Sequence, residues 1–275
     1  MFRRIRREKN DFLTIIGFIA ATALIIIGMN SNAGYLIFWD PLSIYITVGG
    51  AIGTLLMAYP VSEFKRLGKV IIQVMKEQEL SKLDTISLFI NLSKKARREG
   101  LLSLEDEIAQ IENDFVKKAM NMVVDGVEPE SIKEIMTLEI NEMEKRHNDA
   151  ASVFKTLGAY APAMGMLGTL IGLIQMLADL TDSSNLAKGM GKALITTFYG
   201  SIVANVIALP IAAKLEYRSA QEIGTRQMII EGVLAIQSGV NPRIIEDKLV
   251  AYLSPDERSK YYTVTASSEG VAENG

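Results

Sequence analysis

The chain has 275 residues, of which 49% are hydrophobic and 22% charged, and its formal net charge is −3. It has no cysteine and one histidine, His147, which excludes disulfides, thiolate metal sites, a cysteine nucleophile and a multi-histidine metal site. The acidic balance gives no indication of nucleic-acid binding. We therefore expect a membrane protein with a large aqueous part that is not an enzyme, with no catalytic residue, metal site or cofactor.

Four apolar segments reach the roughly 18–20 residues that a helix needs to cross a bilayer. They cover about residues 12–29, 41–59, 156–178 and 193–213. Asp40 and Pro41 are typical of an N-cap and first helical position, so they predict the start of the second span. The fold class expected is an all-α integral membrane protein, with four transmembrane helices in two hairpins and a helical cytoplasmic domain between spans 2 and 3.

Basic residues near the ends of the spans predict the orientation. They lie before span 1 (Arg3, Arg4, Arg6, Arg7, Lys9), after span 2 (Lys65, Arg66, Lys69), before span 3 (Lys145, Arg146, Lys155) and after span 4 (Lys214, Arg218). In the connections 30–40 and 179–192, the only basic residues are Lys188 and Lys192. Both termini and the middle segment should therefore be cytoplasmic. The first apolar run exceeds the ~7–15 residues typical of a signal peptide, which favours a retained membrane helix.

The expected organisation has five parts. They are a cytoplasmic N-terminus (1–11), a first hairpin (12–59), a cytoplasmic helical domain (60–152), a second hairpin (153–213), and a cytoplasmic helical extension with a flexible tail after Lys260 (214–275). Ser103 and the acidic residues after it predict a capping box that opens one helix ending near Gly126. Pro129 should begin a helix that continues into the third span, and the fourth span should extend to about Ser238.

The second hairpin has hydroxyls at membrane depth but no carboxylate. Thr169 lies in the third span, and Thr196, Thr197 and Tyr199 lie in the fourth. A membrane threonine can simply bond to a carbonyl of its own helix. Alternatively, Thr169 and Thr197 face an ion-binding seam, since a hydroxyl oxygen is a hard ligand suited to Na⁺. The titrating acid of such a pathway would then lie on another chain.

Proline and glycine give the spans two further features. Pro162 and Pro210 each free a carbonyl one turn earlier, either as static kinks or as hinges. Glycines form a face of small residues in span 3 (Gly165, Gly168, Gly172) and another in span 2 (Gly49, Gly53). Such faces allow close packing of helices within a subunit or between subunits.

Charged residues are densest from Lys94 to Glu107. The cluster can be a solvated face or an electrostatic docking surface. The glycines at 189 and 191 do not form a phosphate loop, because Leu186 and Ala193 replace the glycine and hydroxyl residue that the motif requires.

Together these residues resemble the flagellar stator A subunit, the MotA/PomA family of the wider MotA/TolQ/ExbB superfamily. The resemblance covers essentially the whole chain. It is carried by KKARREGLLSLEDEI, PAMGMLGTLIG, ALITTFYGSIVANVIALP, and NPRIIEDKL followed by SPDER.

The resemblance implies an ion-driven motor of the bacterial inner membrane. Five A subunits would surround a dimer of a MotB/PomB-like B subunit, whose single membrane helix carries an essential aspartate, and would drive the rotor switch protein FliG. It implies an ion path at Thr169 and Thr197, with Tyr199 beside them, and coupling prolines at Pro162 and Pro210. Arg97 and Glu105 match charged rotor-contact positions, and Glu139 aligns with another.

The transported ion would be H⁺ or Na⁺. Sodium-driven members of the family tend to have threonine at the position of Thr169, and many proton-driven members have alanine, so the resemblance favours Na⁺.

Two alternatives belong to other classes. An ExbB/TolQ-like energiser of outer-membrane transport usually has three spans and an external N-terminus, whereas this chain has an additional N-terminal hairpin and a basic start. A solute transporter would be expected to show an internal repeat or a charged intramembrane substrate site, and the sequence shows neither.

Overall fold

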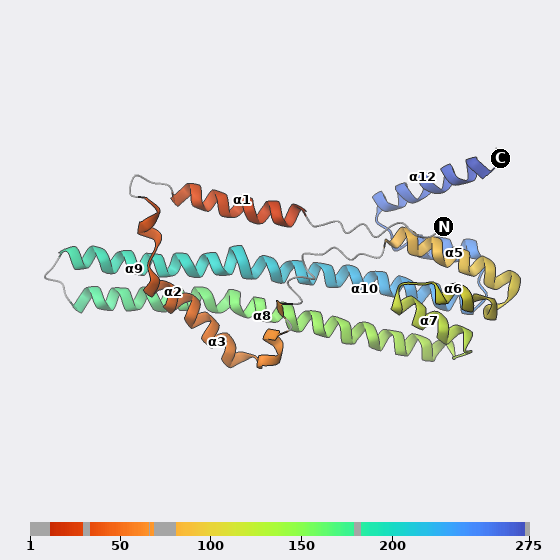
Figure 1. The fold of residues 1–275 in the computed structure, drawn as a ribbon, viewed down its shortest axis with the longest axis horizontal. Helices are drawn as coiled ribbons and strands as arrows, with labels where there is room; N and C mark the ends of the chain where they lie inside the picture. Colours follow the sequence, from red (N-terminus) through yellow and green to blue (C-terminus); the bar gives the residue numbers. More distant parts are fainter. Residues whose placement is uncertain (1–11, 30–33, 66, 69–80, 179–182, 273–275) are drawn as a thin grey trace. The chain divides into compact units, whose positions relative to one another are not determined.

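The computed structural model describes residues 12–29, 34–65, 67–68, 81–178 and 183–272 (Figure 1). The regular elements in these ranges are all helices or helical turns. The chain divides into a first unit of residues 1–78 and 146–218 and a second unit of residues 79–145 and 219–275. Helices α8 (Pro129–Ala178) and α10 (Leu209–Gln237) contribute to both units.

The first unit begins with α1 (Phe12–Met29), which has the predicted bounds. The second apolar segment has four parts: a 3₁₀ turn η1 (Tyr35–Phe38), α2 (Pro41–Ile44), a π turn η2 (Tyr45–Gly49) and α3 (Gly50–Ala58). The predicted cap is confirmed, because the Asp40 carboxylate accepts hydrogen bonds from the backbone N–H of Ser43 (3.1 Å) and from its hydroxyl.

Three stretches of the described chain are long and apolar enough to cross a membrane: Tyr35–Ala58, Pro129–Ala178 and Leu186–Gln237. Thr14–Met29 is a shorter apolar helix. The all-helical membrane class is confirmed, and a fourth crossing by α1 stays a prediction. The basic residues before α1, together with Arg66 and Lys69, lie outside the described residues.

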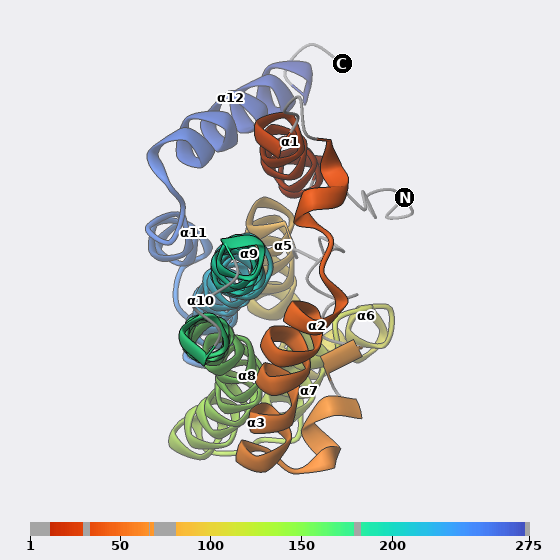
Figure 2. The same cartoon turned by 90° about the vertical axis from the view of Figure 1, so that its left-hand side faces the viewer.

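The second hairpin continues past the membrane-length segments, as predicted. Helix α8 starts at Pro129 and runs through Pro162 to Ala178. Helix α9 (Ser183–Ile202) is followed by a π turn η4 (Val203–Ala208) and then by α10, which ends at Gln237. Figures 1 and 2 show α9 lying alongside the membrane part of α8.

The second unit has one apolar core built from segments far apart in the sequence. Helices α5 (Lys82–Glu99), α7 (Asp114–Val124) and α11 (Pro242–Val250) pack with the adjoining parts of α8 and α10. Its fully buried side chains include Ile86, Phe89, Leu92, Met120, Ile132, Met136, Met228, Ile229, Ile245 and Leu249. The sequence analysis treated the middle segment and the C-terminal extension as separate parts, whereas the structure joins them in this core.

The turn after α5 differs from the predicted capping box. Residues Leu101–Leu104 form a 3₁₀ turn, η3, and the Ser103 hydroxyl donates to the Gly100 carbonyl (2.7 Å) instead of capping a helix. Helix α6 (Glu105–Ala109) is short and has no side-chain cap. Asn113 then caps α7 by accepting from the Val116 N–H (2.8 Å), so the expected single helix is two. The serine hydroxyl bonds within its own turn, which is a common alternative for this residue type.

The flexible tail expected after Lys260 is helical in the structure. Helix α12 (Pro255–Ala272) starts at a reciprocal cap in which Ser254 N–H donates to the Glu257 carboxylate (2.9 Å) and Glu257 N–H donates to the Ser254 hydroxyl (3.3 Å). Burial raises the pKa of Glu257, but the hydrogen bonds from Ser254 and the nearby Lys82 and Lys260 lower it more, so that the net shift is downward. The S-x-x-E spacing of Ser254 and Glu257 is a sequence signal for this helix start that the sequence analysis did not use.

We predict opposite effects of the same substitution at two glycines of α10. A Cβ at Gly232 would lie 3.0 Å from ring atoms of Phe89, which is 0% exposed, whereas a Cβ at Gly224 meets no described atom within 4 Å. Gly224→Ala should raise the free energy of unfolding by up to about 1 kcal/mol through helix propensity. Gly232→Ala should lower it, because overpacking costs about 1–3 kcal/mol.

Thermal unfolding of the detergent-purified protein, followed by circular dichroism, measures the difference. Equal unfolding temperatures for the two variants would contradict the packing at Phe89.

Candidate functional site: a polar seam between the membrane helices

Glycines bring the backbones of α8 and α9 close together. A Cβ at Gly168 would lie 2.6 Å from the Thr196 side chain, and one at Gly172 would lie 3.0 Å from the Gly189 carbonyl oxygen. From α9, a Cβ at Gly200 would lie 2.6 Å from the Ala161 carbonyl oxygen. The small face of the third span therefore packs within the subunit.

The small face of the second span is used differently. A Cβ at Gly49 or at Gly53 would meet no described atom within 4 Å. The described residues of the subunit therefore leave space beside these two glycines, of which Gly49 ends η2 and Gly53 lies in α3.

Close packing joins the two predicted ion-path threonines. The hydroxyl oxygens of Thr169 and Thr197 lie 2.6 Å apart. The Thr169 hydroxyl also lies 3.1 Å from the Gly165 carbonyl oxygen and 3.1 Å from the Ala193 carbonyl oxygen. Thr197 is exposed and Thr169 half-buried, so four oxygen atoms gather at an open face of the subunit. Bonding to a helix carbonyl, one of the two predicted uses of a membrane threonine, is confirmed for Thr169, and an ion-facing role of Thr169 and Thr197 stays a prediction.

Thr196 points the other way. Its side chain is buried against Gly168, and its hydroxyl donates to the Ala193 carbonyl (2.8 Å). The Thr47 hydroxyl of η2 donates to the Thr196 carbonyl (3.3 Å). Adjacent threonines on α9 thus serve opposite faces, with one packing inside the subunit and the other at the seam.

Tyr199 does not lie with Thr169 and Thr197. Its hydroxyl donates to the Phe38 carbonyl and accepts from the Asp40 N–H (3.3 Å). These hydrogen bonds join α9 to the turn that precedes α2, which is a structural role for Tyr199.

Two polar residues that the sequence analysis missed extend the seam. Ser201 and Asn205 follow Thr197 at intervals of four residues, and all three are exposed. The Asn205 amide nitrogen donates to the Ser201 carbonyl (3.0 Å). The four-residue spacing was visible in the sequence and could have identified this stripe. Polar side chains at membrane depth are expected to face protein or water instead of lipid.

The two prolines with a predicted coupling role lie close to the seam along their helices. Pro162 precedes Thr169 by seven residues, which places both on one face of α8, about 10 Å apart along its axis. Pro210 lies just after the π turn η4, where the helix hydrogen-bond ladder changes. Such π turns often occur at functional sites.

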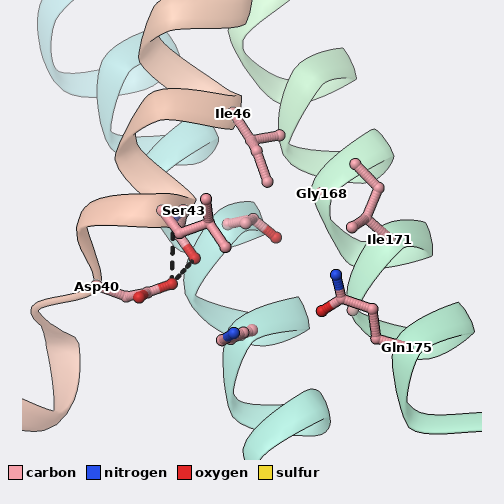
Figure 3. Close-up of a pocket in the computed structure, with 10 residues that line it drawn as sticks. Asp40, Ser43, Ile46, Gly168, Ile171 and Gln175 are labelled. Carbon is pink, nitrogen blue, oxygen red and sulfur yellow. Dashed lines mark hydrogen bonds between the residues drawn. The ribbon is translucent and has the colours of Figure 1, made fainter.

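A small pocket, shown in Figure 3, lies on the Thr196 side of α9, away from the seam. Asp40, Ser43 and Ile46 line it from the second apolar segment, and Ile171 and Gln175 line it from α8. The cavity of ≈ 10 Å³ has room for no more than about one water molecule. Its size does not suit an organic solute.

The predicted rotor-contact residues lie in the second unit. Arg97 is exposed in the last turn of α5, and with Lys94, Arg98 and Pro242 it lines an open pocket of ≈ 290 Å³. Glu105 is exposed at the start of α6. An ion pair joins these two helices, with Lys95 Nζ 3.1 Å from Glu107 Oε1. Arg97 and Glu105 therefore flank one short turn.

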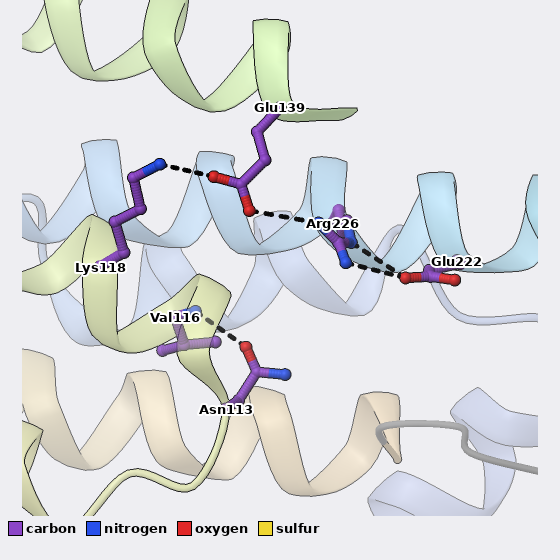
Figure 4. Close-up of polar contacts among 6 residues, drawn as sticks. All are labelled: Asn113, Val116, Lys118, Glu139, Glu222 and Arg226. Carbon is purple, nitrogen blue, oxygen red and sulfur yellow. Dashed lines mark hydrogen bonds and ion pairs between the residues drawn. The ribbon is translucent and has the colours of Figure 1, made fainter. Parts of the chain in front are cut away.

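Glu139 has a different environment, shown in Figure 4. Its carboxylate lies 2.7 Å from Lys118 Nζ on α7 and 3.6 Å from the Arg226 guanidinium on α10. Arg226 also pairs with Glu222 (2.9 Å) and lies 4.6 Å from the centre of the Phe115 ring. The network ties α7, α8 and α10 together, so Glu139 is engaged inside the unit.

Known protein families match this chain over most of its length. Residues 107–228 match the MotA/TolQ/ExbB proton channel family, and residues 15–100 match the motility protein A N-terminal family. The chain is 43% identical to motility protein A of Borreliella burgdorferi over 91% of this chain and 96% of that protein. It is 37% identical to chemotaxis protein PomA of Vibrio alginolyticus over 90% of this chain and 98% of that protein.

One of the matching solved structures covers nearly the whole chain. The flagellar MotAB stator complex from Bacillus subtilis contains a chain that superposes with a TM-score of 0.82 at 34% identity, covering 92% of this chain and 99% of that one. The N-terminal family match, which accompanies the channel-family match, distinguishes this chain from the ExbB/TolQ-like alternative. The chain belongs to the motility protein A family, within the MotA/TolQ/ExbB proton channel family.

Proposed function

We propose that this chain is the A-type subunit of a flagellar stator, which with a B-type subunit converts an ion gradient into torque on the rotor. The observation that carries the proposal is the exposed polar stripe Thr197–Ser201–Asn205 in a protein of this family, beside spans without any carboxylate. A polar seam without a titrating group is half of an ion path. The other half would be the membrane helix of the B-type subunit with its aspartate.

The proposed assembly follows the family. Five copies would surround a B-subunit dimer in the bacterial inner membrane, with both termini cytoplasmic. The open space beside Gly49 of η2 and Gly53 of α3 supports packing of this segment against another chain, because small residues allow helices to approach closely.

The proposed ion is Na⁺, with H⁺ as the alternative. Two hydroxyl and two carbonyl oxygens gather at Thr169 and Thr197, and oxygen ligands of this kind suit a hard cation. One charge crossing a potential of 100 mV supplies about 2.3 kcal/mol, enough to bias a small movement for each ion.

The proposed rotor contact, with FliG as the partner, uses the exposed charges at Arg97 and Glu105. Glu139, the third aligned position, is better explained as part of the ion-pair network of the second unit. We therefore assign the docking surface to the turn between α5 and α6.

Thr197→Val should reduce ion flux and swimming speed by about tenfold, because one ion-facing oxygen contributes about 1–1.5 kcal/mol. Thr196→Val is the matched control, since that hydroxyl is buried and bonds to its own helix. Swimming speed in a strain carrying each variant with the native B subunit, in sodium medium, measures the effect. Equal swimming speeds of the Thr197→Val and Thr196→Val strains would refute the assignment of Thr197 to the ion path. Separately, swimming that is unchanged when sodium is removed would refute Na⁺ as the transported ion.

Arg97→Glu should impair motility several-fold while leaving the level of assembled complex unchanged, because the side chain is exposed and a surface charge contributes about 0–1 kcal/mol to folding. Lys133→Glu makes the same charge reversal at an exposed position of α8 in the same unit. Soft-agar motility and the amount of complex in membranes are the two readouts. Full motility of the Arg97→Glu variant would contradict the assignment of Arg97 to the rotor contact.

A further inference from the structure

One leucine of the α5–α6 turn is exposed although its neighbours pack inward. Leu104 is 0% exposed, and Leu101 packs against the core of the second unit. Leu102, between them, is 72% exposed. A single exposed leucine is common on protein surfaces, so its surroundings decide whether it has a use.

The turn holds Leu102 in a fixed, outward position. Gly100 has a positive φ of 87°, a conformation that favours glycine, and its N–H donates to the Ala96 carbonyl (2.9 Å). The Ser103 hydroxyl and N–H both donate to the Gly100 carbonyl, at 2.7 and 3.3 Å. The Lys95–Glu107 ion pair joins the two flanking helices. A partner that binds here therefore meets an ordered turn, which reduces the entropy lost on binding.

Charges of both signs surround the leucine along the chain. Arg97 and Arg98 precede it, and Glu105 and Asp106 follow it, all exposed. An apolar centre inside a polar rim is the usual composition of a protein interface. On the basic side, Lys94, Arg97 and Arg98 converge with Pro242 on the open pocket of ≈ 290 Å³, which suits a carboxylate of a partner.

We infer that Leu102 is the apolar anchor of the rotor contact, and that its partner presents an apolar socket next to a carboxylate that enters the basic pocket. The inference rests on the proposed stator function and adds the chemistry of the docking site to it. Burial of Leu102 supplies affinity, and the charges on either side set the register of the partner.

Leu138 provides a matched control. It is 60% exposed and lies on α8 of the same unit, beside Glu139, whose carboxylate is engaged with Lys118 and Arg226. Leu138 does not line the basic pocket. Truncating either leucine removes the same atoms from a similarly exposed position, so folding effects should be alike.

The experiment compares Leu102→Ala, Leu102→Met, Leu138→Ala and Arg97→Glu in the full complex with the B subunit. The readouts are binding of purified rotor switch protein to the complex in nanodiscs, ion flux, and swimming speed. Leu102→Ala should weaken binding about tenfold and slow swimming, because the variant has less apolar area to bury when the rotor binds. Ion flux should be unchanged, because Leu102 is buried only in the contact with the rotor. Leu102→Met should restore both, and Leu138→Ala should match the wild type.

The outcomes separate the inference from the proposed function. If Arg97→Glu impairs binding and swimming while Leu102→Ala matches Leu138→Ala, the anchor is refuted and the stator function stands. If neither Arg97→Glu nor Leu102→Ala affects binding or swimming, both the anchor and the rotor contact are refuted. A loss with Leu102→Ala that Leu102→Met does not restore would also refute the apolar anchor.

Discussion

Hydrocarbon offers no hydrogen-bond partner, and this constraint governs the arrangement of the membrane helices. Two buried threonines find their partners within the chain: the Thr196 hydroxyl donates to the Ala193 carbonyl, and the Thr47 hydroxyl donates to the Thr196 carbonyl. The stripe from Thr197 to Asn205 has polar side chains that remain exposed on the subunit surface. Because leaving polar side chains in lipid would be costly, the stripe favours a covering partner chain or water at this face.

The features around the seam depend on one another. Glycines at 165, 168 and 172 allow α9 to approach α8, and only this approach puts the hydroxyls of Thr169 and Thr197 2.6 Å apart. Pro162 lies on the same helix as Thr169, and the π turn η4 and Pro210 follow Thr197 along the chain. Helix α8 also includes Glu139, and α10 includes Arg226, whose ion pair belongs to the second unit. Helix α8 thus carries residues of both the seam and this ion-pair network, whereas α10 carries Pro210 and Arg226.

Sequence reasoning succeeded where signals were local and periodic. The bounds of α1, the Asp40 cap and the start of α8 at Pro129 follow from apolar run length and capping chemistry. It failed where the answer depended on tertiary contacts. Tyr199 shares a helix with Thr197, but two residues of separation turn it toward Phe38. The charge of Glu139 is readable, but its partners on α7 and α10 are not. The pairing of Thr169 with Thr197 and not Thr196 likewise required the register between two helices.

The central claim is that this chain supplies the polar wall of an ion path and its partner supplies the titrating acid. Sodium flux into liposomes tests it most directly, with the chain alone, with the native B subunit, and with a B subunit whose membrane aspartate is replaced by asparagine. The account predicts flux only with the native B subunit. Comparable flux through the chain alone, or through the complex with the asparagine variant, would contradict it.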